Sequence, residues 1–213
     1  MRASVGLALL IAVGCAQAAV TIQFEYLPDG TALGSDVLIT TQYQLSHGVT
    51  FSGGSAMRPG GIVLESGITL NESDFPPLSG THVLSDTEGP ITGEFDSPMK
   101  SIEAYFTYVT PVTLTAWDKF GNPTSIRSSY TENYANSLYP SPNEFIGLSS
   151  KDGFVSFRIE GDPLGNSFVL DDFTFDSVQS ATAVPEASGI WSGAVLALIG
   201  ACKFFGVGGF KRH

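Results

Sequence analysis

The segment that begins at residue 20 alternates between apolar and polar side chains. In VTIQFEY (Val20–Tyr26) every second residue, beginning with Val20, is β-branched or aromatic, and polar residues stand between them. Successive side chains of a strand point to opposite faces, so this period of two predicts a half-buried strand. Its buried face is expected to carry Val20, Ile22, Phe24 and Tyr26.

Similar short runs recur along the chain, separated by Gly, Pro, Asn, Asp and Ser. They are YQLSHGVTF (Tyr43–Phe51), GIVLE (Gly61–Glu65), HVLS (His82–Ser85), ITGEF (Ile91–Phe95), SIEAYFTYV (Ser101–Val109), VTLTAWD (Val112–Asp118), SIRSSY (Ser125–Tyr130), EFIGLS (Glu144–Ser149), FVSFRIE (Phe154–Glu160) and SFVLDDFTF (Ser167–Phe175). No helical period of useful length lies between them. This pattern predicts an all-β protein, an antiparallel jelly-roll-like β-sandwich over residues 20–176.

The first eighteen residues have the organisation of a secretory signal peptide. A basic Arg2 precedes the apolar run VGLALLIAVG, and the small-residue stretch AQA ends at Ala18. We therefore expect residues 1–18 to be a signal peptide that is cleaved after Ala18. A competing interpretation takes Cys15 as the lipidated first residue of a lipoprotein. After cleavage at Ala18, Cys202 is the only cysteine, so the exported domain contains no disulfide.

The C-terminal end combines a linker, an apolar segment and a basic cluster. Residues 177–188 are small and polar, residues 189–210 are largely apolar, and residues 211–213 read KRH. Twenty residues from Trp191 to Phe210 form a helix of about 30 Å, enough to cross a bilayer if Lys203 extends toward the cytoplasmic surface. This predicts a transmembrane helix over 189–210, with a cytoplasmic basic end at Lys211 and Arg212 and the domain outside.

The charge of the central segment excludes one class of function. All 21 acidic residues lie between Glu25 and Glu186, together with only six basic ones, which gives this segment a net charge of −15. So acidic a surface repels phosphate backbones, which excludes nucleic acid as a partner. It suits divalent cations or a solvated surface.

Sequence motifs of catalysis are absent. The three histidines, His47, His82 and His213, are far apart, and no nucleophile, phosphate-binding or zinc motif occurs. We therefore expect a protein that is not an enzyme. A small glycan-active hydrolase with paired carboxylates stays open as the alternative, because two acids of any spacing can meet across a sandwich.

Two groups of residues are candidate binding sites. Strand alternation sends the neighbouring Asp171 and Asp172 to opposite faces. If the first and last strands are neighbours, Glu25 or Asp29 approaches Asp171. Such carboxylates suit Ca²⁺, although both aspartates could instead lie at a strand edge in water. A second group, for sugar rings, consists of Trp117, Tyr130, Tyr134 and Tyr139; the alternative is that these tyrosines cover the rim of the core.

The C-terminal segment closely resembles the PEP-CTERM sorting signal of bacterial exported proteins. The resemblance rests on the motif Val184, Pro185, Glu186 and Ala187, on the apolar run from Gly189 to Phe210, and on the basic stop at Lys211 and Arg212. It implies export, transient anchoring in the membrane, recognition by an exosortase, and a place in a bacterial cell envelope that produces exopolysaccharide. Two departures are Ala187, where the family has a second proline, and Lys203 within the apolar run.

The central segments are similar, more distantly, to exported β-sandwich domains and to jelly-roll carbohydrate-binding modules. FEYLPDGTAL, VTLTAWDKFGNP and FVLDDFTF carry this resemblance, which implies a structural calcium ion held by Glu25 and Asp171. The expected function is that of a non-catalytic cell-surface or matrix protein that binds polysaccharide. In this interpretation the domain is held outside the membrane by its tail, or released after exosortase processing.

Overall fold

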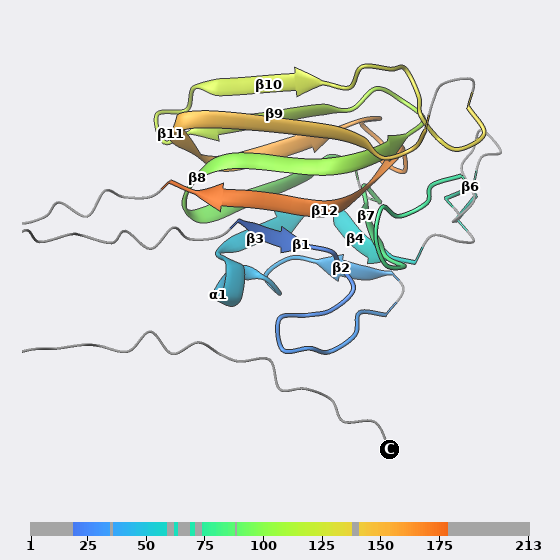
Figure 1. The fold of residues 1–213 in the computed structure, drawn as a ribbon, viewed down its shortest axis with the longest axis horizontal. Coiled ribbons are helices and arrows are strands. Elements are labelled where there is room, and N and C mark those ends of the chain that lie inside the picture. The colour runs from blue at the N-terminus through green and yellow to red at the C-terminus, as the bar shows by residue number, and fades with distance from the viewer. Residues whose placement is uncertain are drawn as a thin grey trace, which may run out of the picture. The chain divides into compact units, whose positions relative to one another are not determined.

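Antiparallel strands form almost all of the regular structure. The computed structural model describes residues 19–34, 36–58, 62–63, 69–70, 74–87, 89–137 and 141–178. The elements are β1 (Val20–Ile22), β2 (Val37–Ile39), α1 (Gln44–His47), β3 (Val49–Ser52), β4 (Gly54–Met57), β5 (Ile62–Val63), β6 (Thr69–Leu70), β7 (Val83–Ser85), β8 (Ile91–Tyr108), β9 (Thr113–Asp118), β10 (Pro123–Arg127), β11 (Glu144–Glu160) and β12 (Phe168–Ser177). The prediction of an all-β, antiparallel fold is confirmed (Figure 1).

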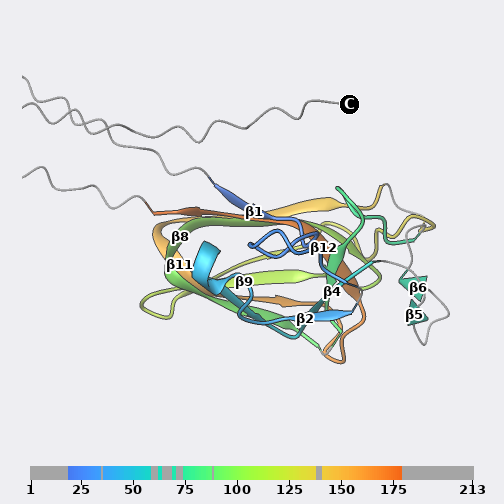
Figure 2. The same cartoon turned by 90° about the horizontal axis from the view of Figure 1, so that it is seen from below.

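The strands lie in two layers that share the two longest strands. In the first layer, β3 pairs with the first half of β8, which pairs with the second half of β11, followed by β9 and β10. In the second layer, the first half of β11 pairs with the second half of β8, and β12 follows. Beyond β12 lie β1 along one part of its length and β7, β4 and β2 along another (Figure 2).

Both long strands change layer near their midpoints. The pairing of β11 with β8 shifts register between Ser149 and Phe154, and again between Phe154 and Ser156. Gly153, at φ +80°, lies against Pro98 of β8, where a larger side chain would clash. Such bulges bend a strand and increase its twist, which carries β8 and β11 from one layer into the other.

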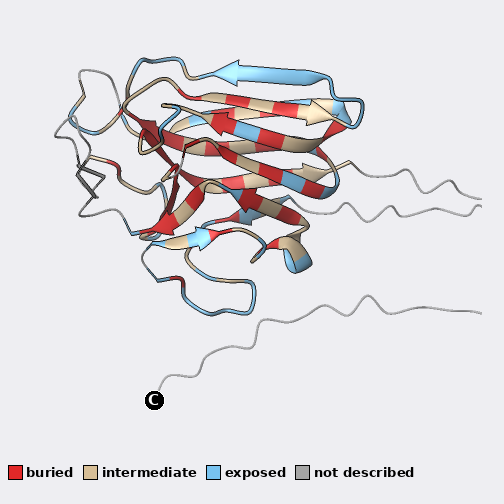
Figure 3. Cartoon of the chain, turned by 180° about the vertical axis from the view of Figure 1, so that it is seen from behind, coloured by how far each residue is buried: buried red, intermediate tan, exposed pale blue. Residues whose placement is uncertain are grey.

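Aromatic side chains from the two layers meet in the core. Phe173 of β12 packs against Phe51 and Phe157, with ring centroids 5.4 and 5.1 Å apart, and Phe175 lies 5.2 Å from Phe95. Buried positions alternate with less buried ones along β3 and β9 and along parts of β8, β11 and β12, as Figure 3 shows. Among the described residues, the core of buried side chains extends from Ile22 to Phe175.

Several predicted strands differ from those observed. The runs at 91–95 and 101–109 belong to one strand, β8, and those at 144–149 and 154–160 belong to β11. The run at 43–51 begins with a helical turn, α1, and only its second half is a strand. Strands β2, β4 and β6 are not among the predicted runs, because they are short and lack clear alternation.

The predicted first strand ends earlier than its pattern suggests. β1 stops at Ile22, and Phe24 adopts φ +58°, a left-handed conformation that is rare for a bulky residue. Phe24 is buried as expected, but the side chain of Tyr26 is 61% exposed, so its predicted place on the buried face is wrong. The turn at Phe24 directs Glu25 toward the loop before β7.

Candidate functional site

The outer surface of the first layer carries a shallow depression. Its volume is about 390 Å³, and it lies over β3, β8, β9 and β11. Alternation along these strands sends polar side chains outward while the core residues between them point inward. The lining consists of Thr50, Phe51, Ser52, Thr92, Gly93, Glu94, Trp117, Ser156, Phe157 and Arg158.

One row of outward side chains crosses this depression from β3 to β9. Glu94 lies opposite Thr50 on one side and opposite Ser156 on the other, and Ser156 in turn lies opposite Trp117. Directly opposite residues of antiparallel strands have Cβ atoms about 5 Å apart, so the four side chains form a continuous line. The half-buried indole of Trp117 lies at one end of the row, followed by the hydroxyl of Ser156, the carboxylate of Glu94 and the hydroxyl of Thr50.

A second row runs parallel to the first and contains a fixed cation. Thr92 lies opposite Ser52 and Arg158, and Arg158 lies opposite Thr115. The guanidinium of Arg158 donates to both carboxylate oxygens of Glu160, over 3.2 Å from Nε and 2.9 Å from Nη2. A two-point ion pair of this kind orients the planar guanidinium and leaves other N–H groups free to donate.

Gly93 allows the core to pack closely beneath the depression. A Cβ atom at this position would lie 2.5 Å from Phe157 Cε1 and 2.5 Å from the carbonyl oxygen of Thr50. Because glycine has no side chain, the ring of Phe157 occupies this space and packs against Phe51, with centroids 5.8 Å apart. The floor of the depression therefore rests on two core phenylalanines.

The predicted aromatic platform does not form as a unit. Trp117 borders the depression, but the ring of Tyr134 stacks on the buried Phe75, with centroids 6.3 Å apart, and belongs to a small core cluster. This is the core-covering role that was the alternative for the tyrosines. Tyr130 is 38% exposed and does not line the depression, and Tyr139 lies outside the described residues.

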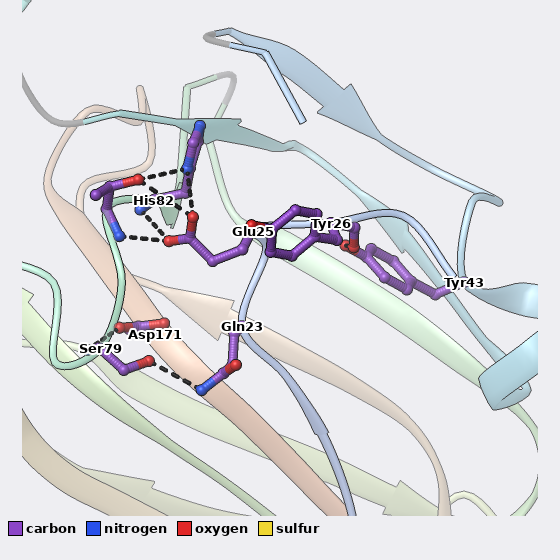
Figure 4. Close-up of polar contacts among 8 residues, drawn as sticks. Gln23, Glu25, Tyr26, Tyr43, Ser79, His82 and Asp171 are labelled. Carbon is purple, nitrogen blue, oxygen red and sulfur yellow. Dashed lines mark hydrogen bonds and ion pairs between the residues drawn. The ribbon is translucent and has the colours of Figure 1, made fainter. Parts of the chain in front are cut away.

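Glu25 and Asp171, the two predicted metal ligands, both contact the loop before β7. The carboxylate of Glu25 accepts hydrogen bonds from the backbone N–H groups of Thr81 and His82, and its Oε2 lies 3.0 Å from His82 Nδ1. Asp171 Oδ2 accepts from the N–H of Ser79 at 2.8 Å. Figure 4 shows both side chains directed at this loop, with Asp171 beside Ser79 and Glu25 beside His82. Asp29, the other candidate, accepts from Thr31 within its own turn.

A bulge in β12 overturns the predicted separation of Asp171 and Asp172. Asp171 pairs with Tyr105 and Thr174 pairs with Glu103, so β12 has two residues between these pairs where β8 has one. Asp172, one of the two, adopts φ +49°. The extra residue breaks strict alternation. As a result both carboxylates reach Ser79, since its hydroxyl donates to Asp172 Oδ1 at 2.9 Å.

The two predicted ligands differ in the direction of their pKa shift. Burial acts to raise the pKa of Glu25, but hydrogen bonds from Thr81 and His82 outweigh it and hold the pKa below its usual value. Burial raises the pKa of Asp171 to about 6, against hydrogen bonds from Ser79 and Asp172 that lower it. The surroundings therefore favour the ionised form of Glu25 and disfavour that of Asp171.

The backbone N–H groups of the loop donate most of the hydrogen bonds that these two carboxylates accept. Calcium takes six to eight oxygen ligands, whereas the residues described contain no group of three or more His, Cys, Asp or Glu side chains placed to hold a metal ion. Backbone and hydroxyl oxygens would have to supply the remaining ligands. The calcium site at Glu25 and Asp171 stays a prediction.

The predicted terminal segments lie outside the described residues. These are the signal peptide, the sorting motif from Val184 to Ala187, the apolar segment 189–210 and the basic stop at Lys211 and Arg212. Among the residues that the structure does describe, no helix has the length and apolar character needed to span a membrane.

Comparisons with known proteins returned structural likenesses only. No family model and no curated protein matches the chain. The K2 cleaved adhesin domain of Lys-gingipain is 13% identical, with a TM-score of 0.40, over 74% of this chain and 99% of that domain. The CBM22-1 xylan-binding domain of Paenibacillus barcinonensis Xyn10C is 14% identical, with a TM-score of 0.37, over 79% of this chain and 100% of that domain. A DUF4465 family protein from Bacteroides caccae is 16% identical, with a TM-score of 0.35, over 63% of this chain and 78% of that protein.

Proposed function

We propose that the protein is a non-catalytic, exported cell-surface or matrix protein whose jelly-roll-like domain binds polysaccharide. The binding site is the depression on the outer face of the first layer, and Trp117 is its aromatic contact. The observation that carries the proposal is the alignment of this indole with Glu94, Arg158 and several hydroxyl groups across four strands.

The chemistry of the depression matches that of a sugar chain. A pyranose ring has an apolar face of C–H groups and a rim of hydroxyl groups, so it needs a flat aromatic surface and several hydrogen-bond partners. Trp117 supplies the surface, Glu94 accepts hydrogen bonds, and Arg158 donates them. An open depression across several strands suits a polymer that continues beyond the site at both ends.

The same lining supports binding over hydrolysis. Glycosidases of the common type use two carboxyl groups on either side of the scissile bond, about 5 to 10 Å apart. Of the residues that line the depression, only Glu94 has a carboxyl group. The carboxylate of Glu160 is bound to Arg158 and does not line it.

A sedimentation assay with insoluble polysaccharides tests this proposal on a protein of residues 19–178. Binding is expected to fall at least about tenfold in Trp117→Ala, because stacking and desolvation of an aromatic anchor contribute more than about 1.4 kcal/mol. Phe120→Ala is the matched control, since Phe120 is a 73% exposed aromatic residue that does not line the depression. Equal binding by both variants contradicts the proposed site. Release of reducing sugar by the wild type, lost in Glu94→Gln, would instead support the hydrolase alternative.

We further propose that the tail anchors the domain in the bacterial envelope and that an exosortase processes it. Support comes from the sequence alone, from the Pro185–Glu186 motif, the apolar segment and the basic end. Mass spectrometry of the mature protein from its native host tests this. Processing predicts a C-terminus near the Pro-Glu motif, whereas an intact chain ending at His213 would indicate a permanent anchor.

A further inference from the structure

Strand β10 forms a free edge of the first layer. Within the described part of the chain it pairs only with β9, and all five of its residues are exposed. Thr124 and Ile126 lie opposite Ala116 and Leu114, which are buried core residues, so their side chains are on the inner face of the layer. Ile126 is nevertheless 38% exposed. The strand thus extends past the core and leaves the apolar side chain of Ile126 uncovered. Figure 3 shows β10 exposed along its whole length.

The hydrogen-bond pattern shows which backbone groups of β10 point away from β9. Asp118 N donates to Asn122 O at 3.1 Å, and Ser128 N donates to Val112 O at 2.8 Å. Hydrogen-bonded and non-hydrogen-bonded pairs alternate between these two ends of the hairpin. The backbone groups of Pro123, Ser125 and Arg127 therefore face the free edge.

We propose that β10 pairs with β10 of a second copy of this chain, antiparallel and about a two-fold axis at Ser125. The backbone N–H of Ser125 in each copy then donates to the backbone carbonyl of Ser125 in the other copy. The backbone N–H of Arg127 donates to the carbonyl of Pro123 in the second copy. Pro123 has no N–H of its own, so in this register it only accepts. The register uses every free N–H of the edge and makes four backbone hydrogen bonds.

Side chains on both faces fit the same register. On the inner face, Ile126 lies opposite Thr124 of the second copy, a β-branched pair that covers the exposed apolar group. On the outer face, Arg127 lies opposite Pro123 of the second copy, and the next residue in that row is Trp117. No two like charges stand directly opposite.

The size and charge of the contact predict a weak dimer that salt strengthens. Pairing of five-residue strands buries less surface than the roughly 1,200 Å² of a stable interface. Residues 19–178 carry twenty acidic and six basic side chains, so two copies repel each other at long range. Screening this repulsion is expected to lower the dissociation constant, the opposite of an interface held by ion pairs.

Cysteine cross-linking tests the register directly. Residues 19–178 contain no cysteine, so an introduced thiol is unique. In the proposed dimer the two Ser125 Cα atoms are about 5.5 Å apart, within the range that a disulfide bridges. Under mild oxidation Ser125→Cys is expected to give a covalent dimer. Phe120→Cys, at the exposed tip of the same hairpin, is expected to remain monomeric.

Sedimentation velocity with a matched pair of variants tests the role of the backbone. Ser125→Pro removes an N–H that faces away from β9 and is expected to abolish the dimer, while Ser125→Ala keeps the N–H and the dimer. Equal cross-linking at positions 120 and 125, or a dimer that persists in Ser125→Pro, overturns the proposal. If Ser125→Pro does not fold, the cross-linking result alone decides.

Discussion

Asp86 is a buried carboxyl group whose ionisation couples folding to pH. It lies between β7 and β8, and its side chain accepts hydrogen bonds from Ser167 N, Ser167 Oγ and Phe168 N, at 2.7 to 3.1 Å. It thereby joins the loop after β7 to the loop before β12. Burial, which outweighs these hydrogen bonds, raises the pKa of Asp86 to about 7.

The sign and size of the effect follow from this pKa. An unfolded aspartate titrates near 3.8, so the folded state binds the proton more tightly than the unfolded state. The contribution to stability is complete below about pH 4 and is lost as the pH rises through 7. A difference of roughly three units corresponds to about 4 kcal/mol in the free energy of unfolding, as an order of magnitude.

Urea unfolding of residues 19–178 between pH 4 and pH 8, with the wild type and Asp86→Asn, measures this contribution. Asparagine keeps an oxygen for Ser167 N and Phe168 N, and its amide can donate to Ser167 Oγ, but it does not titrate. From pH 4 to pH 8 the free energy of unfolding of the wild type is expected to fall by about 4 kcal/mol relative to that of the variant. Subtracting the variant removes the effects of Asp171 and of other carboxyl groups. Parallel pH profiles for the two proteins would show that the ionisation of Asp86 does not contribute to stability.

Two further substitutions test the packing beneath the depression and the predicted ion. Gly93→Ala is expected to lower the free energy of unfolding by about 1 to 3 kcal/mol, because the added methyl group meets Phe157 and backbone. Gly34→Ala, where a Cβ meets only ordinary contact, should differ little in the same urea titration, and equal losses would contradict the packing argument. Added Ca²⁺ is expected to raise the Tm of the wild type in calorimetry and to have no effect on Asp171→Ala. An unchanged wild-type Tm removes the calcium prediction.

Alternation of side chains predicted the fold class well because each half of a sandwich strand keeps one face in the core. It failed where strands change layer. Pro98 and the stretch around Gly153 look like turns in the sequence, yet each lies inside a strand that continues into the other layer. Helix α1 was missed because four residues are too few for a helical period. Tertiary contacts, such as the hydrogen bond from Tyr43 to the carbonyl of Tyr26, hold it in place.

The candidate sites were only partly predictable. Trp117 was recognised as a candidate by residue type, but Glu94 and Arg158 were not. Their alignment with Trp117 depends on the register of strands that are distant in sequence, which one sequence does not reveal. The first and last strands pair, as expected, but only over Val20–Ile22. Glu25 reaches the loop before β7 through the turn at Phe24, which the alternation of the sequence does not predict. The bulge that also brings Asp172 to Ser79 has no clear signal in the sequence.

Amide chemical-shift mapping of isotope-labelled residues 19–178 with soluble oligosaccharides tests whether the depression on the first layer binds sugar chains. Shifts are expected to concentrate on the two rows of the outer face, around Thr92, Glu94, Trp117 and Arg158. These shifts are expected to disappear in Trp117→Ala. Shifts that centre on the loop before β7 or on the outer face of the second layer would contradict this binding site, as would the absence of shifts with every glycan that the native host produces.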